Sequence, residues 1–147
     1  MNTTKACFSL LVGFVVSTTV AFADDISGAQ LFDHATMNEA FSKGKLLVTN
    51  SRYKVLAGRR VEPGVVEVHE HDTDVIYVTE GSATFVIGGT INDAKIDSPS
   101  EIRAKSSNGG TAHHLTKGDV IIVPKGIPHW FSEVSGTFLY FVVKVTE

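Results

Sequence analysis

The sequence predicts an all-β domain, built as a sandwich or a barrel, with one short helix at its N-terminal end. From Leu46 onward, apolar and polar residues alternate with a period of two, which is typical of half-buried strands. Short runs rich in valine, isoleucine and tyrosine are separated by turn residues such as those at 62–64 and 88–89. With 147 residues, of which 43% are hydrophobic and 20% are charged, the chain has the size of one globular domain.

The first segment, residues 1–23, is expected to be a signal peptide rather than part of the fold. Lys5 makes its start positive, residues 6–20 are almost entirely apolar or small, and residues 21–23 have the small-x-small pattern of a signal-peptidase site. The signal peptide predicts an exported protein, periplasmic or secreted. Because the apolar run is too short for a membrane span, we expect no stable membrane insertion after cleavage. The single cysteine, Cys7, lies in this segment, so the mature chain cannot rely on disulfide bonds.

Residues 24–45 form the second segment, in which Leu31, Ala35 and Phe41 give a partial helical stripe and Gly44 is a suitable end for a helix. The third segment, residues 46–147, is the β domain. Its strands are expected at 53–61, 65–71, 75–80, 83–87, 111–115, 119–123, 129–132 and 137–145. A tight hairpin is expected at Glu80 and Gly81. The polar stretch 92–110 is expected to be a long excursion from the sheet, with one helical turn near 99–103.

Three histidines in two stretches indicate a metal site. His69 and His71 are separated by one residue, so in a strand both side chains point to the same face. The second stretch begins at Gly118 and places His129 just after a turn that contains proline and glycine. Neutral imidazole is a preferred ligand of divalent first-row metals. We therefore predict that the three histidines meet in space and bind a metal ion.

Two carboxylates are candidates for further roles at this site. Asp74 follows the histidine pair and is the candidate fourth ligand, with capping of a turn as the alternative. Glu67 has the same strand parity as His69 and is expected to face the interior, where it is the candidate catalytic proton acceptor. The alternatives for Glu67 are the fourth ligand, a partner that orients a histidine, or an ion pair with Arg59 or Arg60.

Both stretches resemble the sequence motifs of the cupin superfamily. Gly64, His69-x-His71, Asp74 and residues 77–81 are similar to the first cupin motif, and Gly118-x5-Pro124-x-Gly126-x2-His129 is similar to the second. The resemblance covers about residues 53–145 and implies a single cupin-type jelly-roll β-barrel. The first motif departs from the family pattern, because four residues instead of five separate its glycine from its first histidine. An aspartate also stands where the family has a glutamate, and Glu133 takes the place of an asparagine often found after the second motif.

The predicted cofactor is one divalent transition metal per chain, with iron or manganese favoured over zinc, nickel or copper. Three histidines and a carboxylate leave adjacent coordination positions for a substrate oxygen and dioxygen, which favours a dioxygenase-like oxidoreductase acting on a small organic molecule. The alternatives are a metal-dependent isomerase or lyase, and a non-catalytic cupin that binds a sugar or an organic acid. The fold by itself does not decide among them.

Charge and apolar surface bear on the partners. The net charge is -3 and the chain has no basic run, which argues against binding of nucleic acid. The helix before Gly44 and the apolar run 138–141 offer surface for a homodimer.

Overall fold

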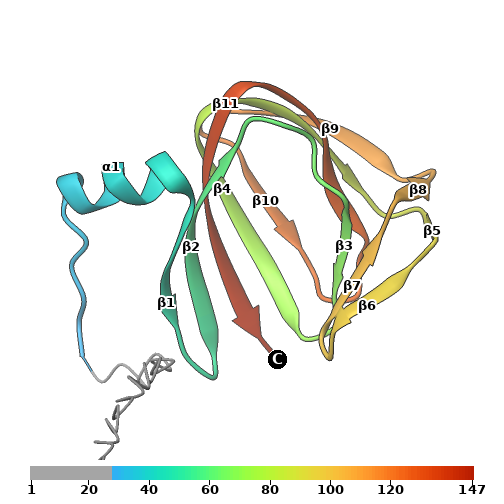
Figure 1. Cartoon of the computed structure of the whole chain (residues 1–147), viewed down its shortest axis with the longest axis horizontal. Helices are drawn as coiled ribbons and strands as arrows, with labels where there is room; N and C mark the ends of the chain where they lie inside the picture. The colour runs from blue at the N-terminus through green and yellow to red at the C-terminus, as the bar shows by residue number, and fades with distance from the viewer. Residues whose placement is uncertain (1–27) are drawn as a thin grey trace, which may run out of the picture.

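The computed structural model describes residues 28–147, so the predicted signal peptide lies outside the described residues. The described part contains one helix and eleven strands (Figure 1). In chain order they are α1 (His34–Lys43), β1 (Lys45–Thr49), β2 (Tyr53–Arg60), β3 (Val66–His69), β4 (Asp72–Ile87), β5 (Thr90–Asn92), β6 (Lys95–Ser98), β7 (Glu101–Ala104), β8 (Ser106–Asn108), β9 (Thr111–Thr116), β10 (Val120–Val123) and β11 (His129–Thr146). Among the described helices, none has the length and apolar character needed to span a membrane.

Helix α1 is short because both of its ends are defined by local signals. The Asp33 side chain caps the start by accepting a hydrogen bond of 2.8 Å from the Thr36 amide. Gly44, with a φ of 69°, ends the helix immediately before β1. The helix lies against β1 and β2 at one edge of the barrel, and Phe41 packs edge-on against Phe141 of β11 with ring centroids 5.0 Å apart (Figure 1).

The barrel is organised by two long antiparallel strands, β4 and β11. Their pairing extends from the pair His129 and Ile87 at one end to the pair Thr146 and Asp72 at the other. The first half of β4 also pairs with β10, and the second half pairs with β9. The last half of β11 pairs with β2, and its first residue pairs with β3, which continues to β7 and β6. Each long strand therefore belongs to both walls of a curled sheet. The prediction of an all-β jelly-roll barrel with a short N-terminal helix is confirmed.

Several predicted strand ends are wrong. β4 runs without interruption through Glu80 and Gly81, where a hairpin was expected. Gly81 has a φ of 78°, and a Cβ at this position would collide with the Thr137 carbonyl oxygen of β11. Glycine is thus required here because two backbones approach each other closely, and not because the chain reverses direction. The helical turn expected near 99–103 is also wrong, because residues 101–104 form β7 and pair with β3.

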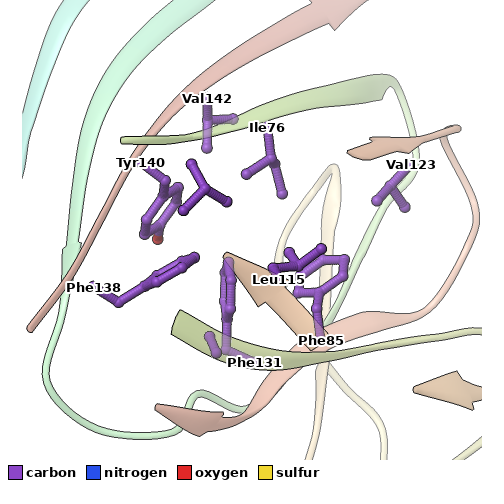
Figure 2. Packing of buried hydrophobic residues seen from close by; sticks show 10 residues of the cluster. Ile76, Phe85, Leu115, Val123, Phe131, Phe138, Tyr140 and Val142 are labelled. Carbon is purple, nitrogen blue, oxygen red and sulfur yellow. The ribbon is translucent and has the colours of Figure 1, made fainter. Parts of the chain in front are cut away.

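The core lies between the two walls of the barrel and combines aliphatic side chains with four aromatic rings, those of Phe85, Phe131, Phe138 and Tyr140 (Figure 2). Phe85 and Phe138 are fully buried, and the Phe131 ring lies between them, with centroid distances of 4.6 Å to Phe85 and 5.3 Å to Phe138. Phe85 also lies 5.8 Å from the His129 ring. The apolar core therefore forms one wall of the histidine site.

Candidate metal centre

The candidate site is assembled from both walls of the barrel. β3 provides Glu67 and His69, and the first residue of β11, His129, is the direct cross-strand partner of Glu67. The opposite wall provides Asp74 from β4 and Lys144 from β11, which are also direct cross-strand partners. All five side chains line one cavity of about 470 Å³. Strand pairing thus converts residues far apart in the sequence into a single cluster.

Three of these residues form a group with suitable geometry for a metal ion. One ligand atom each from Glu67, His69 and His129 lies within 4.8 Å of the other two. The two imidazole rings are 5.0 Å apart between centroids, and only 5% of His69 and 4% of His129 is exposed. Two nitrogen ligands and one carboxylate oxygen in a buried site suit a divalent transition metal.

Each histidine is held so that the same ring nitrogen faces the cavity. His69 Nδ1 lies 2.6 Å from the Glu101 carboxylate, and His129 Nδ1 lies 2.9 Å from the Ile127 carbonyl oxygen. Both partners are acceptors, so Nδ1 carries the hydrogen in each ring. The Nε2 atoms are therefore the ones that face inward, at 3.4 Å (His69) and 3.8 Å (His129) from the Asp74 carboxylate. Such outer hydrogen bonds typically fix the rings of metal-binding histidines.

Asp74 is buried, and its carboxylate forms an ion pair with Lys144. Lys144 Nζ lies 2.8 Å and 2.9 Å from the two carboxylate oxygens of Asp74. The same nitrogen lies 2.6 Å from His69 Nε2. At this distance the two nitrogens are joined by a single hydrogen bond. The amino group of Lys144 therefore stands among the atoms that face the centre of the site.

The environment moves the pKa values of the two histidines in opposite directions. Burial acts to lower the pKa of His69, but hydrogen bonds with Asp74 and Glu101 raise it to about 9. Burial lowers the pKa of His129 and outweighs the effect of its bond to the Ile127 carbonyl. Burial also acts to raise the pKa of Asp74, but His69 and Lys144 lower it. The pKa of His129 thus lies below its ordinary value, and the pKa of His69 lies above it.

His71 is not brought to this cluster. β3 ends at His69, and His71 lies exposed in the bend that leads to β4. The expectation that the two histidines share one strand face is therefore wrong. The backbone carbonyl of His71 accepts a hydrogen bond of 2.8 Å from the Glu147 amide, which joins the bend to the residue after β11. β3 thus ends before a second inward position is reached after His69.

The charged partner of Glu67 also differs from the expected one. Arg103 of β7 approaches Glu67 at 3.5 Å, whereas the sequence suggested Arg59 or Arg60. Arg60 lies half-buried in the cavity wall, with its guanidinium 4.9 Å from the centre of the Phe131 ring and its Nε 3.2 Å from the Tyr140 hydroxyl. Within residues 28–147, Arg60 has no carboxylate within 4.0 Å. It is a cation available to a ligand in the cavity.

Sequence comparison identifies the family of the chain. Residues 55–147 match the sequence model of the family described as Cupin. The chain is a cupin. The match includes every residue of the candidate site and both motifs. No curated protein matches this cupin at a significant level.

Solved structures with a similar fold are distant in sequence. The conserved protein SPY1581 of Streptococcus pyogenes superposes with a TM-score of 0.53 and 14% identity over 88% of this cupin and 97% of that chain. A cupin 2 conserved barrel domain protein of Rhodopseudomonas palustris superposes with a TM-score of 0.49 and 14% identity, over 71% of this cupin and 60% of that chain. The polyketide cyclase RemF of Streptomyces resistomycificus superposes with a TM-score of 0.48 and 19% identity, over 71% of this cupin and 64% of that chain. This cupin thus spans less than two thirds of the latter two proteins, and the likeness concerns the fold alone.

Sequence reasoning missed two residues of the site, Glu101 and Lys144. Glu101 lies in the polar stretch that was expected to leave the sheet, and no pattern around it predicts contact with His69. Lys144 does have a signal. Phe138, Tyr140 and Val142 are buried at alternate positions of β11, and Lys144 is the next residue with the same parity. A lysine at an inward position of an apolar strand should have been examined as a site residue.

Proposed function

We propose that this cupin binds one divalent transition metal through Glu67, His69 and His129. The observation that supports the proposal is the orientation of the two imidazoles, whose Nδ1 atoms are occupied by fixed acceptors while their Nε2 atoms face a common centre. Two histidines and one carboxylate are the donor set of many non-haem iron oxygenases. We infer that the reaction is an oxygen-dependent oxidation of a small organic acid.

The residues around the donors have separate tasks in this proposal. When bound, the metal would supply open coordination positions and one-electron chemistry. Glu101 and the Ile127 carbonyl keep the rings in the orientation that ligation requires. The carboxylate of Glu67 would offset part of the charge of a bound metal, and Arg103, 3.5 Å away, would restrict the movement of this carboxylate. Phe85 excludes water from the His129 side.

Arg60 supports an acid as the substrate class. Its guanidinium lines the same cavity as the donors and is held by the Phe131 ring and the Tyr140 hydroxyl. A half-buried guanidinium without a carboxylate partner within the described residues is a binding group for a carboxylate, which it can contact through two parallel hydrogen bonds. We propose that the substrate carboxylate binds Arg60 and that its reacting carbon points toward the histidines.

A second candidate function is binding of a small acid without catalysis. The position of Lys144, 2.6 Å from His69 Nε2, favours it because this cation can serve the anionic site in place of a metal. Both candidates keep Arg60 as the anchor of the ligand. They differ in whether the site takes a metal and consumes oxygen.

The two candidates are separated by an oxygen-uptake experiment. Protein prepared without a histidine tag is loaded anaerobically with Fe²⁺, its metal content is measured by mass spectrometry, and oxygen uptake is followed with a panel of small hydroxy, oxo and phenolic acids. We expect about one iron per chain and uptake with at least one acid. The Glu67→Gln variant should lose uptake. An iron-loaded protein that binds an acid in calorimetry but consumes no oxygen with it would reject the oxidation in favour of the binding role.

Replacing Arg60 with methionine tests the substrate class. Methionine keeps much of the apolar stem that packs on Phe131 but removes the charge. We expect the Kd or KM of the acid to rise by about tenfold to a hundredfold, the effect of losing a charge-assisted hydrogen bond. Arg52→Met is the control, because Arg52 is exposed and does not line the cavity. Equal losses in both variants would show a non-specific charge effect and remove Arg60 from the site.

A further inference from the structure

We propose that Lys144 is an intramolecular competitor of the metal: its amino group occupies the metal position, and a metal ion binds when Lys144 leaves it. The inference rests on the metal site proposed above and deepens it. It assigns a regulatory role to a residue outside both sequence motifs. It also predicts two exclusive states of the site, one closed by Lys144 and one open to a metal.

The first argument is the position of the Lys144 nitrogen. Three contacts of 2.6–2.9 Å join Nζ to His69 Nε2 and to both oxygens of Asp74. Nε2 is the only ring nitrogen of His69 that a metal can use, because Nδ1 is held by Glu101. Nε2 cannot form this hydrogen bond with Lys144 and a bond to a metal at the same time. Contact of His69 Nε2 with Lys144 and binding of a metal by the same nitrogen are therefore mutually exclusive.

The second argument is electrostatic. Lys144 and a divalent cation at the centre of Glu67, His69 and His129 would lie within a few ångströms of each other in a buried cluster, where repulsion between like charges is much stronger than in water. The Lys144 side chain is only 17% exposed, so little solvent screens it in the closed state. A metal therefore gains access when the flexible lysine stem moves its charge away.

The third argument concerns Asp74, the predicted fourth ligand. In the closed state both of its oxygens contact Lys144, so neither is free for a metal. Its Oδ2 nevertheless lies 3.4 Å from His69 Nε2 and 3.8 Å from His129 Nε2, beside the two nitrogens that would bind the metal. When Lys144 leaves, Asp74 becomes an unpaired buried carboxylate facing these donors, and a cation is the partner it requires. The availability of Asp74 as a ligand thus depends on Lys144.

The test measures Co²⁺ binding at one fixed pH, by calorimetry and by the visible absorption of the bound ion. Lys144→Met should bind Co²⁺ at least about tenfold more tightly than the unmodified protein. Lys54→Met is the matched control. Lys54 is the cross-strand neighbour of Lys144 and forms an equivalent ion pair with Asp72 at 2.7 Å, but it does not line the cavity. This control should bind Co²⁺ like the unmodified protein.

A second pair of variants keeps the test valid if Lys144→Met is poorly folded. Asp74→Asn combined with Lys144→Met removes both buried charges, and it should bind Co²⁺ more tightly than Asp74→Asn alone. In the unmodified protein, Co²⁺ should also increase the labelling of Lys144 by an amine-reactive ester, read by mass spectrometry. Equal Co²⁺ affinity with and without Lys144 overturns the competitor role alone. Absence of Co²⁺ binding in every variant overturns the metal site and, with it, this inference.

Discussion

Replacement of His129 by alanine is expected to reduce the metal content of the protein from about one ion per chain to near zero. His129 is 4% exposed, its Nδ1 is fixed by the Ile127 carbonyl, and its Nε2 faces the other candidate donors, so the change would remove one of the three proposed ligands. Metal content after dialysis is measured by mass spectrometry, with circular dichroism to verify the fold. His69→Ala should behave in the same way.

His71→Ala is the matched control for this experiment, because it removes an imidazole from the same motif. His71 lies exposed in the bend after β3, outside the group formed by Glu67, His69 and His129. We expect its variant to keep the full metal content. Loss of metal in His71→Ala together with retention in His129→Ala would contradict the proposed donor set and support the ligand role that the sequence suggests for His71.

Replacement of Phe85 by alanine is expected to lower the free energy of unfolding by about 3–5 kcal/mol, the range for a large buried ring. Phe85 is fully buried, packs on Phe131 at 4.6 Å and adjoins the His129 ring at 5.8 Å. Natural domains are stable by only about 5–15 kcal/mol, so the loss is a large part of the total. Urea denaturation at 25 °C measures it as a lower midpoint with an unchanged slope.

Tyr77→Ala is the control for the core variant, because Tyr77 lies on the same strand but is 44% exposed. Its cost should stay below about 1 kcal/mol. Similar costs at the two positions would mean that the barrel does not depend on the cluster of rings between its walls. Phe85→Ala should also weaken metal binding, since the cavity it creates lets the His129 ring move.

The sequence predicts the fold well where the pattern of side chains is local. Alternation of apolar residues identifies most strands, and Gly44 predicts the end of the helix. The continuity of β4 through Gly81 was not predictable in this way. A glycine between two strands has the same local pattern whether the chain reverses or another backbone passes close to it. The difference lies in Thr137 of β11, which is distant in the sequence.

The candidate site was predictable to the extent that its residues lie in strands of regular register. Parity correctly placed Glu67 on the same inward face as His69, and the second motif brought His129 to them. His71 leaves the face because β3 ends two residues before it. Glu101 reaches His69 through pairing of β7 with β3, which depends on the conformation of the polar stretch between them and not on any residue near the motifs.

The long pairing of β4 with β11 has a consequence for the order in which the site is made. Glu67, His69 and Asp74 all precede His129 and Lys144 by most of the domain, and the two groups meet only when β11 docks. Contacts between such distant segments form slowly. A nascent chain that has not yet released β11 from the ribosome therefore has neither a complete donor set nor its lysine. The proposed metal donors are therefore complete only after β11 has docked and the barrel has closed.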